Sequence, residues 1–188
     1  MQPPMQRVHV VIRLALLVAL GTVGCSSAYW LLYLALPAFA ALLISQKGAA
    51  RYFGEEGPRI VLVLRWLAGA YAYLWLLTDA VPTGKAGGHV DLEVEPTGTP
   101  TPASAILRVV YGLPGLLVLA VISFGGVFLW PIGAIAILVQ RRVPSSIAAF
   151  FAATLRYQFR LLAYQLSLVE QYPSLAPSVP REAHASAA

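Results

Sequence analysis

The stretch from Leu14 to Ser45 reads LALLVALGTVGCSSAYWLLYLALPAFAALLIS and carries no charged residue. A second uncharged stretch, VVYGLPGLLVLAVISFGGVFLWPIGAIAILVQ, runs from Val109 to Gln140. A transmembrane helix needs about 20 apolar residues, so each stretch is too long for one upright span and long enough for two short ones. Together they predict an all-α polytopic membrane protein.

The composition supports this class. Of the 188 residues, 59% are hydrophobic and only 11% are charged, whereas a soluble domain has about 25% charged residues. A soluble fold of this size could not bury so much apolar surface. The net charge of +5 comes from cations at the ends of the apolar stretches, as in membrane proteins with a cytoplasmic excess of Lys and Arg, so nucleic acid is not an expected partner. With one cysteine, no intrachain disulfide can form.

The chain contains two divergent copies of one unit. The copies match at an offset of 91 residues in Leu64-Arg65-Trp66, Ala72-Tyr73, Leu77, Asp79 and Pro82 against Leu155-Arg156-Tyr157, Ala163-Tyr164, Leu168, Glu170 and Pro173. Upstream, the offset is 94 for Pro37, Ala40, Gln46 and Lys47 against Pro131, Ala134, Gln140 and Arg141, and 95 for Arg13 against Arg108. The order of the matches holds throughout, so an internal repeat is expected.

The domain organisation follows from this repeat. The first unit covers 8–82, with a helical hairpin at about 8–45 and a helix at about 58–80. A polar linker rich in Pro, Gly and Thr covers 83–104, in which a short strand over 89–95 is a weak alternative. The second unit covers 105–173, with a hairpin at about 105–140 and a helix at about 145–171, and the tail 174–188 is expected to be disordered.

Hairpins are expected because each apolar stretch has helix breakers near its middle. These are the segments 24–27 and 123–126, and basic residues stand at both ends of each stretch. If each stretch were a single span, one basic cluster of each pair would lie outside, against the positive-inside rule. Two hairpins instead place every basic cluster, and both termini, on the cytoplasmic side of a bacterial inner membrane, in a multi-pass protein.

The helix that closes each unit has a different character. In the second copy Arg156, Arg160, Tyr164, Ser167 and Gln171 fall on one side of a helix, which predicts an amphipathic helix lying in the membrane interface. The corresponding helix of the first copy is nearly apolar and either crosses the membrane or lies in the interface beside its twin. A two-fold axis along the membrane normal would make the two helices antiparallel.

The second of these helices carries a family resemblance. The pattern Leu155-Arg156-Tyr157, Arg160, Ala163-Tyr164, Leu168, Glu170 and Tyr172-Pro173 resembles the closing segment of the bacterial membrane family called domain of unknown function 4389. The first copy departs from it at Gly69 and Val81, and the second at Ser174. The family has no known activity to carry over, so the resemblance implies a fold and leaves the function open.

No catalytic, cofactor-binding or metal-binding residues are predicted. His9, His89 and His184 stand far from each other in the sequence, unlike the clustered ligands of a metal site. Charged residues in apolar helices are the remaining candidates, because such charges are costly there. They are candidates for lipid or inter-repeat contacts: Arg65, Asp79, Arg156, Arg160 and Glu170. Antiparallel helices would bring Arg65 towards Glu170 and Arg156 towards Asp79.

These features favour a non-enzymatic membrane scaffold or interaction subunit that contacts anionic lipid or a partner protein through its amphipathic helices. Its partners would be the phospholipid bilayer and a membrane protein or a second copy of the chain. A small transporter or channel built on the repeat is the alternative, and a membrane enzyme comes third. The segment Thr22–Cys25 resembles a lipoprotein cleavage box, but an uncleaved N-terminus is expected because the repeat begins upstream of it.

Overall fold

The computed structural model describes residues 6–23, 26–81, 94 and 96–173, and within them it contains helices and no strand. The expectation of an all-α protein is therefore confirmed. The elements are α1 (Arg7–Val23), α2 (Ser26–Lys47), α3 (Ala49–Arg51), the π-helical turn η1 (Tyr52–Glu56), α4 (Gly57–Leu74), α5 (Pro102–Gln140) and α6 (Ser145–Gln165). Cys25, most of the linker and the tail 174–188 lie outside the described residues.

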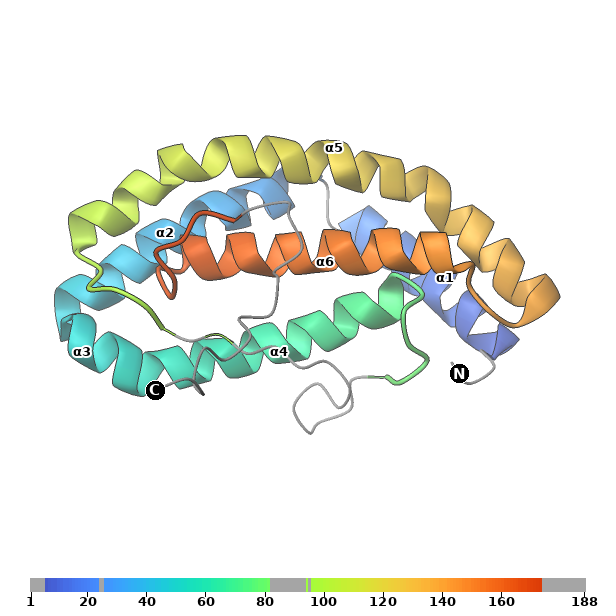
Figure 1. The fold of residues 1–188 in the computed structure, drawn as a ribbon, viewed down its shortest axis with the longest axis horizontal. Helices are drawn as coiled ribbons and strands as arrows, with labels where there is room; N and C mark the ends of the chain where they lie inside the picture. The colour runs from blue at the N-terminus through green and yellow to red at the C-terminus, as the bar shows by residue number, and fades with distance from the viewer. Residues whose placement is uncertain (1–5, 24–25, 82–93, 95, 174–188) are drawn as a thin grey trace, which may run out of the picture.

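Helix α6 is the central element of the bundle. Figure 1 shows it between α5 and α4, which runs antiparallel to it as the repeat predicts, and α2 also contacts it. Every residue from Leu161 to Leu168 is buried, so the predicted polar stripe exists only in the first half of the helix. Tyr164 and Ser167, which were expected to face the membrane interface, lie in the core because neighbouring helices cover both sides of α6.

Helix α5 corrects the hairpin predicted over 105–140. It is one continuous helix of 39 residues that runs through the expected turn at 123–126, and Figure 1 shows it as a single bowed arc. Gly126 does not break the helix. It makes room for a neighbour, because a Cβ there would lie 2.6 Å from Cζ3 of Trp75. Pro114 and Pro131 lie inside the helix, and proline is a common cause of helix bending.

The first apolar stretch does not form a hairpin either. Helix α1 contacts α4 and α5, whereas α2 contacts α5 and α6. The two helices therefore follow each other along α5 instead of packing side by side, as Figure 1 shows. The predicted hairpin over 8–45 is therefore wrong, because α1 and α2 pack mainly on other helices and not on each other.

A sharp bend separates α2 from α4. The helix axis turns by 116° between Tyr33–Lys47 and Ala49–Leu74, and Gly48 adopts the left-handed φ of 77° that the turn requires. Lys47 Nζ donates a hydrogen bond to Glu56 Oε1 at 2.5 Å across this bend. The bend therefore returns α4 along the bundle, towards the N-terminal end of α6.

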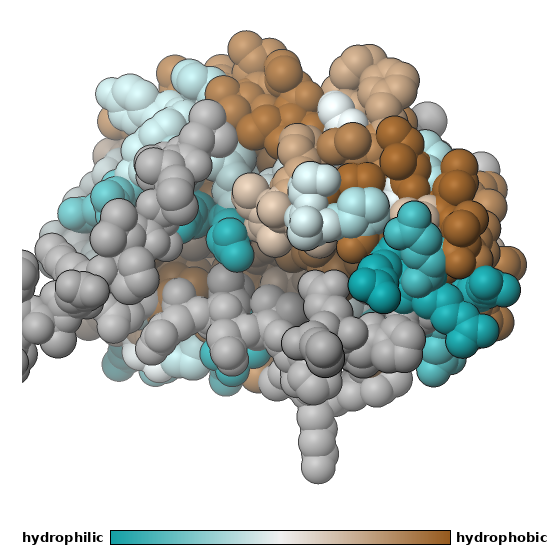
Figure 2. All heavy atoms as spheres, turned by 45° about the vertical axis from the view of Figure 1, so that its right-hand side comes forward, coloured by the Kyte–Doolittle hydropathy of each residue, from teal (hydrophilic) through white to brown (hydrophobic). Residues whose placement is uncertain are grey.

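The outer surface of α5 is apolar along its length. We call this surface the α5 ridge, and it comprises the exposed hydrophobic residues Ile106, Leu107, Val110, Tyr111, Leu113, Leu117, Val121, Phe124, Val127, Phe128, Ile132, Ile135, Leu138 and Val139. Figure 2 shows hydrophobic residues on the upper side of the molecule, where α5 lies, and hydrophilic residues at the lower right. Among the described residues α5 is the one helix long and apolar enough to cross a membrane; the bent pair of α2 and α3–α4 meets the same criterion only when taken together.

Candidate functional site

The most distinctive local structures are the C-terminal ends of α4 and α6. Each helix ends on a residue in the left-handed conformation, Leu76 with φ 62° and Ser167 with φ 57°. The following amide donates back five residues in both cases, from Leu77 N to Ala72 O and from Leu168 N to Ala163 O. This is the Schellman arrangement, which stops a helix. It explains why α4 and α6 end before residues 80 and 171, where the sequence pattern placed their ends.

An arginine from α1 binds the end of α4. Arg13 is completely buried, and its Nη2 donates to the carbonyl of Thr78 and lies 2.8 Å from Asp79 Oδ1. Its guanidinium carbon lies 4.5 Å from the centre of the Tyr73 ring. The amide of Gln6 donates to the other oxygen of Asp79 at 2.7 Å. The buried charge is thus compensated by a carboxylate, a carbonyl and an aromatic face.

An arginine from α5 binds the end of α6 in a similar way. Arg108 is 6% exposed, and its Nη1 donates to the carbonyls of Tyr164 and Val169 at 2.6 and 2.5 Å. Its guanidinium carbon lies 4.6 Å from the centre of the Tyr164 ring. Carbonyls at a helix C-terminus carry partial negative charge, so a cation there stabilises the helix end.

The two ends use corresponding residues. Tyr73 and Tyr164, Leu76 and Ser167, and Thr78 and Val169 are each separated by 91 positions, the offset found in the sequence. Each end also receives an aromatic donor from the other half of the chain. Tyr52 donates its hydroxyl hydrogen to the carbonyl of Leu166, and Trp130 Nε1 donates to the carbonyl of Leu74 at 2.9 Å.

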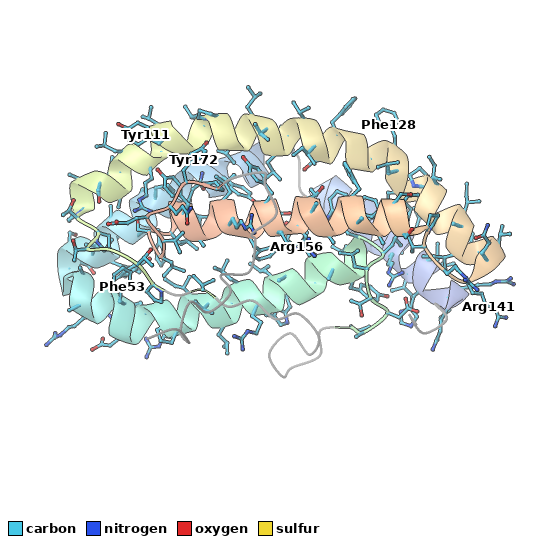
Figure 3. All side chains as sticks on the ribbon, in the orientation of Figure 1. Phe53, Tyr111, Phe128, Arg141, Arg156 and Tyr172 are labelled. Atoms are coloured by element: carbon cyan, nitrogen blue, oxygen red, sulfur yellow. The ribbon has the colours of Figure 1, made fainter. Side chains whose placement is uncertain are left out.

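The sequence-predicted candidates lie in different places. Asp79 joins Arg13 instead of Arg156, so the predicted pairing of Arg156 with Asp79 is not what the structure contains. Arg156 is exposed on α6 and lies at the centre of the view in Figure 3. Arg65 and Arg160 are partly buried on α4 and α6, and Glu170 is exposed beyond the end of α6.

Arg13 and Arg108 were missed as site residues. The sequence pattern used them as matching positions of the expected repeat and as basic residues that precede the uncharged stretches. Their correspondence at an offset of 95, together with a tyrosine that recurs at an offset of 91, was the signal that could have identified them. A buried arginine needs an acceptor, and the end of a helix is where backbone acceptors are free.

A polar cleft of ≈ 370 Å³ opens beside Arg108. It is lined by Thr99, Thr101, Ser104, Leu107, Arg108, Tyr111, Tyr164 and Glu170. A second, apolar cleft of ≈ 660 Å³ lies between α1, α4 and α5 and is lined by Leu17, Trp66, Leu67, Ala70, Tyr71, Leu74, Trp75, Gly126, Val127 and Trp130. In the part of the chain that the structure describes, no group of His, Cys, Asp and Glu side chains could hold a metal ion.

A family model matches a segment in the second half of the chain. Residues 102–176 match the family described as a domain of unknown function, DUF4389. This segment contains α5, α6 and the Arg108 site, and its match to the family model agrees with the resemblance seen in the sequence. No curated protein and no solved structure matches the chain.

Proposed function

We propose that the protein is a non-enzymatic scaffold or interaction subunit of the bacterial cytoplasmic membrane, embedded through the α5 ridge. The observation that carries this proposal is the ridge itself, which exposes large apolar side chains from Ile106 to Val139 with no charged side chain on its surface. A monomeric soluble protein rarely exposes a contiguous apolar surface of this extent. Contact with lipid acyl chains removes this surface from water. It leaves no backbone N–H or C=O group of α5 without a hydrogen bond, because these groups are paired within the helix.

The length of α5 favours a helix that lies along the membrane over one that crosses it upright. Its 39 residues span ~58 Å at ~1.5 Å per residue, whereas the hydrocarbon core is about 30 Å thick. In an upright helix, roughly half of the ridge would face water. A helix lying near the surface keeps the ridge in lipid and leaves Arg141 and Arg142, which follow it, in the headgroups.

The connection between α4 and α5 supports the same orientation. Figure 1 shows the C-terminal end of α4 and the N-terminal end of α5 towards opposite ends of the molecule. The segment that joins them contains Lys85, His89, Asp91, Glu93 and Glu95. If the bundle stood upright in the bilayer, this polar segment, with the charges of Lys85, Asp91, Glu93 and Glu95, would have to pass through hydrocarbon, which is strongly unfavourable. In the proposed orientation all polar segments, and both termini, lie on the cytoplasmic side.

In this proposal the chain consists of two divergent units, and an aromatic side chain of each unit donates to the helix end of the other. The matching set of arginine, tyrosine and left-handed residues at the ends of α4 and α6 supports the division into two units. The surface available to a partner protein is the exposed side of α6. It carries small side chains at Ser145, Ser146, Ala149 and Ala153, followed by Arg156. Small residues let a second helix approach closely, and Arg156 supplies a polar anchor.

Orientation is tested by single cysteines in a Cys25→Ser background. One cysteine replaces Gly88, before α5, and another replaces Ser146, after α5. We expect an impermeant thiol reagent to label neither position in intact cells and both in opened membranes. Labelling of one position alone in intact cells would show that α5 crosses the membrane and would contradict this orientation.

Embedding of the ridge is tested by paired substitutions. Leu117→Arg with Val121→Arg places two charges on the ridge, where a charge costs about 3 kcal/mol at membrane depth. Ala149→Arg with Ala153→Arg places the same charges on the exposed side of α6. Alkaline carbonate should release the first variant from membranes far more readily than the second. Equal retention of the two variants would contradict membrane contact through α5.

A further inference from the structure

The two corresponding helix ends differ in the position of the carboxylate. In the first, Asp79 reaches Arg13 directly, with 2.8 Å between Oδ1 and Nη2. In the second, Glu170 occupies the corresponding position, yet among the ion pairs of the described residues none joins it to Arg108. Both residues instead line a cleft of ≈ 370 Å³. The helix end at Arg108 therefore has a cleft, whereas at Arg13 the carboxylate binds the arginine directly. We call the end at Arg108 the open helix end and the end at Arg13 the closed helix end.

Glu170 is held on the far side of this cleft. Its backbone amide donates to Thr97 Oγ1 at 3.2 Å, and its carboxylate rests against the backbone of Gly98. A Cβ at Gly98 would lie 1.9 Å from Glu170 Oε1, and Gly98 has a left-handed φ of 84°. Only glycine allows both the conformation and the close approach. The loop that precedes α5 thus fixes the carboxylate apart from the arginine.

The opposite wall of the cleft is suited to an anion. Both hydrogen bonds of Arg108 within the described chain come from Nη1, so Nη2 and Nε remain for a ligand. Thr101 and Ser104 cap the first turn of α5 by reciprocal hydrogen bonds, so the positive end of the helix dipole is directed at the same region. An anion at Arg108 would take the place that the Asp79 carboxylate takes at Arg13.

The cleft also lies at one end of the α5 ridge. Leu107 and Tyr111 line it and belong to the ridge as well, with 52% and 58% of their surfaces exposed. Figure 3 shows Tyr111 near the N-terminal end of α5. Tyrosines gather at the level of lipid headgroups, where the ring is in apolar surroundings and the hydroxyl is in water. A lipid whose acyl chains lie along the ridge would bring its headgroup to this position.

From this geometry we propose that the cleft binds the headgroup of an aminophospholipid such as phosphatidylethanolamine. The phosphate accepts hydrogen bonds from Arg108, and the primary ammonium donates to Glu170. A cleft with a cation on one wall and a carboxylate on the other selects a zwitterion over a purely anionic headgroup. The ammonium's N–H donors distinguish ethanolamine from choline, which has none. This inference rests on the proposed contact between the α5 ridge and lipid.

The test uses the full chain, purified in detergent and stripped of lipid, with native mass spectrometry as the readout. We expect phosphatidylethanolamine to bind about tenfold more tightly than phosphatidylcholine or phosphatidylglycerol, the effect of one charge-assisted hydrogen bond. Glu170→Gln should abolish the preference for ethanolamine over choline. Asp79→Asn, at the closed helix end, should leave the preference intact and serves as the matched control. Thermal unfolding of both variants verifies that they are folded.

Three outcomes would overturn the inference. The first is equal affinity of the unaltered chain for the three lipids, and the second is an unchanged preference in Glu170→Gln. The third is equally tight binding of soluble glycerophosphoethanolamine, which would make the ligand a free phosphoamine instead of a lipid. The carbonate extraction described above reports on the ridge alone, so failure of headgroup selection is distinguishable from failure of membrane embedding.

Discussion

Tyr52 donates its hydroxyl hydrogen to the carbonyl of Leu166 and so ties the bend after α2 to the end of α6, 114 positions away in the sequence. Tyr52 is fully buried, so no water can replace the lost donor. We expect Tyr52→Phe to lower the free energy of unfolding by about 1–3 kcal/mol, because it leaves a buried carbonyl without a donor. Thermal or denaturant unfolding in detergent measures the change.

Tyr111→Phe is the control for that substitution. The side chain of Tyr111 is 58% exposed, so removal of its hydroxyl should change the free energy of unfolding by less than ~0.5 kcal/mol. If both variants unfold alike, Tyr52 does not hold the end of α6.

The ion pair of Arg13 and Asp79 should be energetically coupled. The two side chains are 0% and 23% exposed, so solvent screens their attraction less than at a surface. In a double-mutant cycle on Arg13→Gln and Asp79→Asn, we expect a coupling above the ~0–1 kcal/mol of exposed pairs. The parallel cycle on Arg156→Gln and Asp79→Asn should be additive, because Arg156 faces outwards. Coupling in the second cycle and none in the first would support the pairing that the sequence suggested.

Two adjacent glycines of α5 should respond in opposite directions to alanine. A Cβ at Gly126 would lie 2.6 Å from the rigid ring of Trp75, whereas at Gly125 the nearest neighbour, Phe150, is 3.7 Å away. Gly126→Ala should destabilise the protein by about 1–3 kcal/mol through overpacking. Gly125→Ala should stabilise it by about 0.5–1 kcal/mol, since alanine is the better helix former. Destabilisation by Gly125→Ala would instead indicate a turn at this point, as in the predicted hairpin.

Ser167 should be replaceable by glycine with a gain in stability. It has a φ of 57° and its buried hydroxyl has no hydrogen-bond partner within the described chain. Glycine relieves the backbone strain, which costs about 1–2 kcal/mol, and removes the unpaired hydroxyl, although the unfolded chain gains freedom. We expect a net increase of about 1 kcal/mol in the free energy of unfolding. Ser167→Ala removes only the hydroxyl, so it should gain less; a larger gain for alanine would contradict the left-handed conformation.

The sequence was sufficient for the all-α class and for the segments that become helices. Helical periodicity and uncharged length are local properties, and they placed α4 and α6 near their observed starts. The ends were misplaced because Leu76 and Ser167 reverse the chain in a conformation that usually selects glycine. Neither residue type signals a helix stop, so the Schellman turns are set by tertiary contacts with Arg13 and Arg108 and not by local preference.

The hairpin over 105–140 was predicted from a segment with glycines, one of which, Gly126, accommodates a side chain that is distant in the sequence. Gly126 suggests a turn when its neighbours in sequence are considered alone. In the folded chain the same glycine admits the ring of Trp75, more than fifty positions earlier. The stripe on α6 was misjudged for a related reason. Its spacing is helical, but whether Tyr164 faces lipid or core depends on α2 and α5, whose placement no local pattern encodes.

The central position of α6 has a consequence for how the chain reaches its native state. The element around which α2, α4 and α5 are arranged is the last helix to leave the ribosome among those described. Until residues 145–165 are synthesised, the surfaces that α6 will cover on the earlier helices have no partner within the chain. Domains generally begin to fold while synthesis proceeds, but here the core closes only after translation of its final helix. We therefore expect these surfaces to need a temporary partner, such as lipid or a chaperone, during that interval.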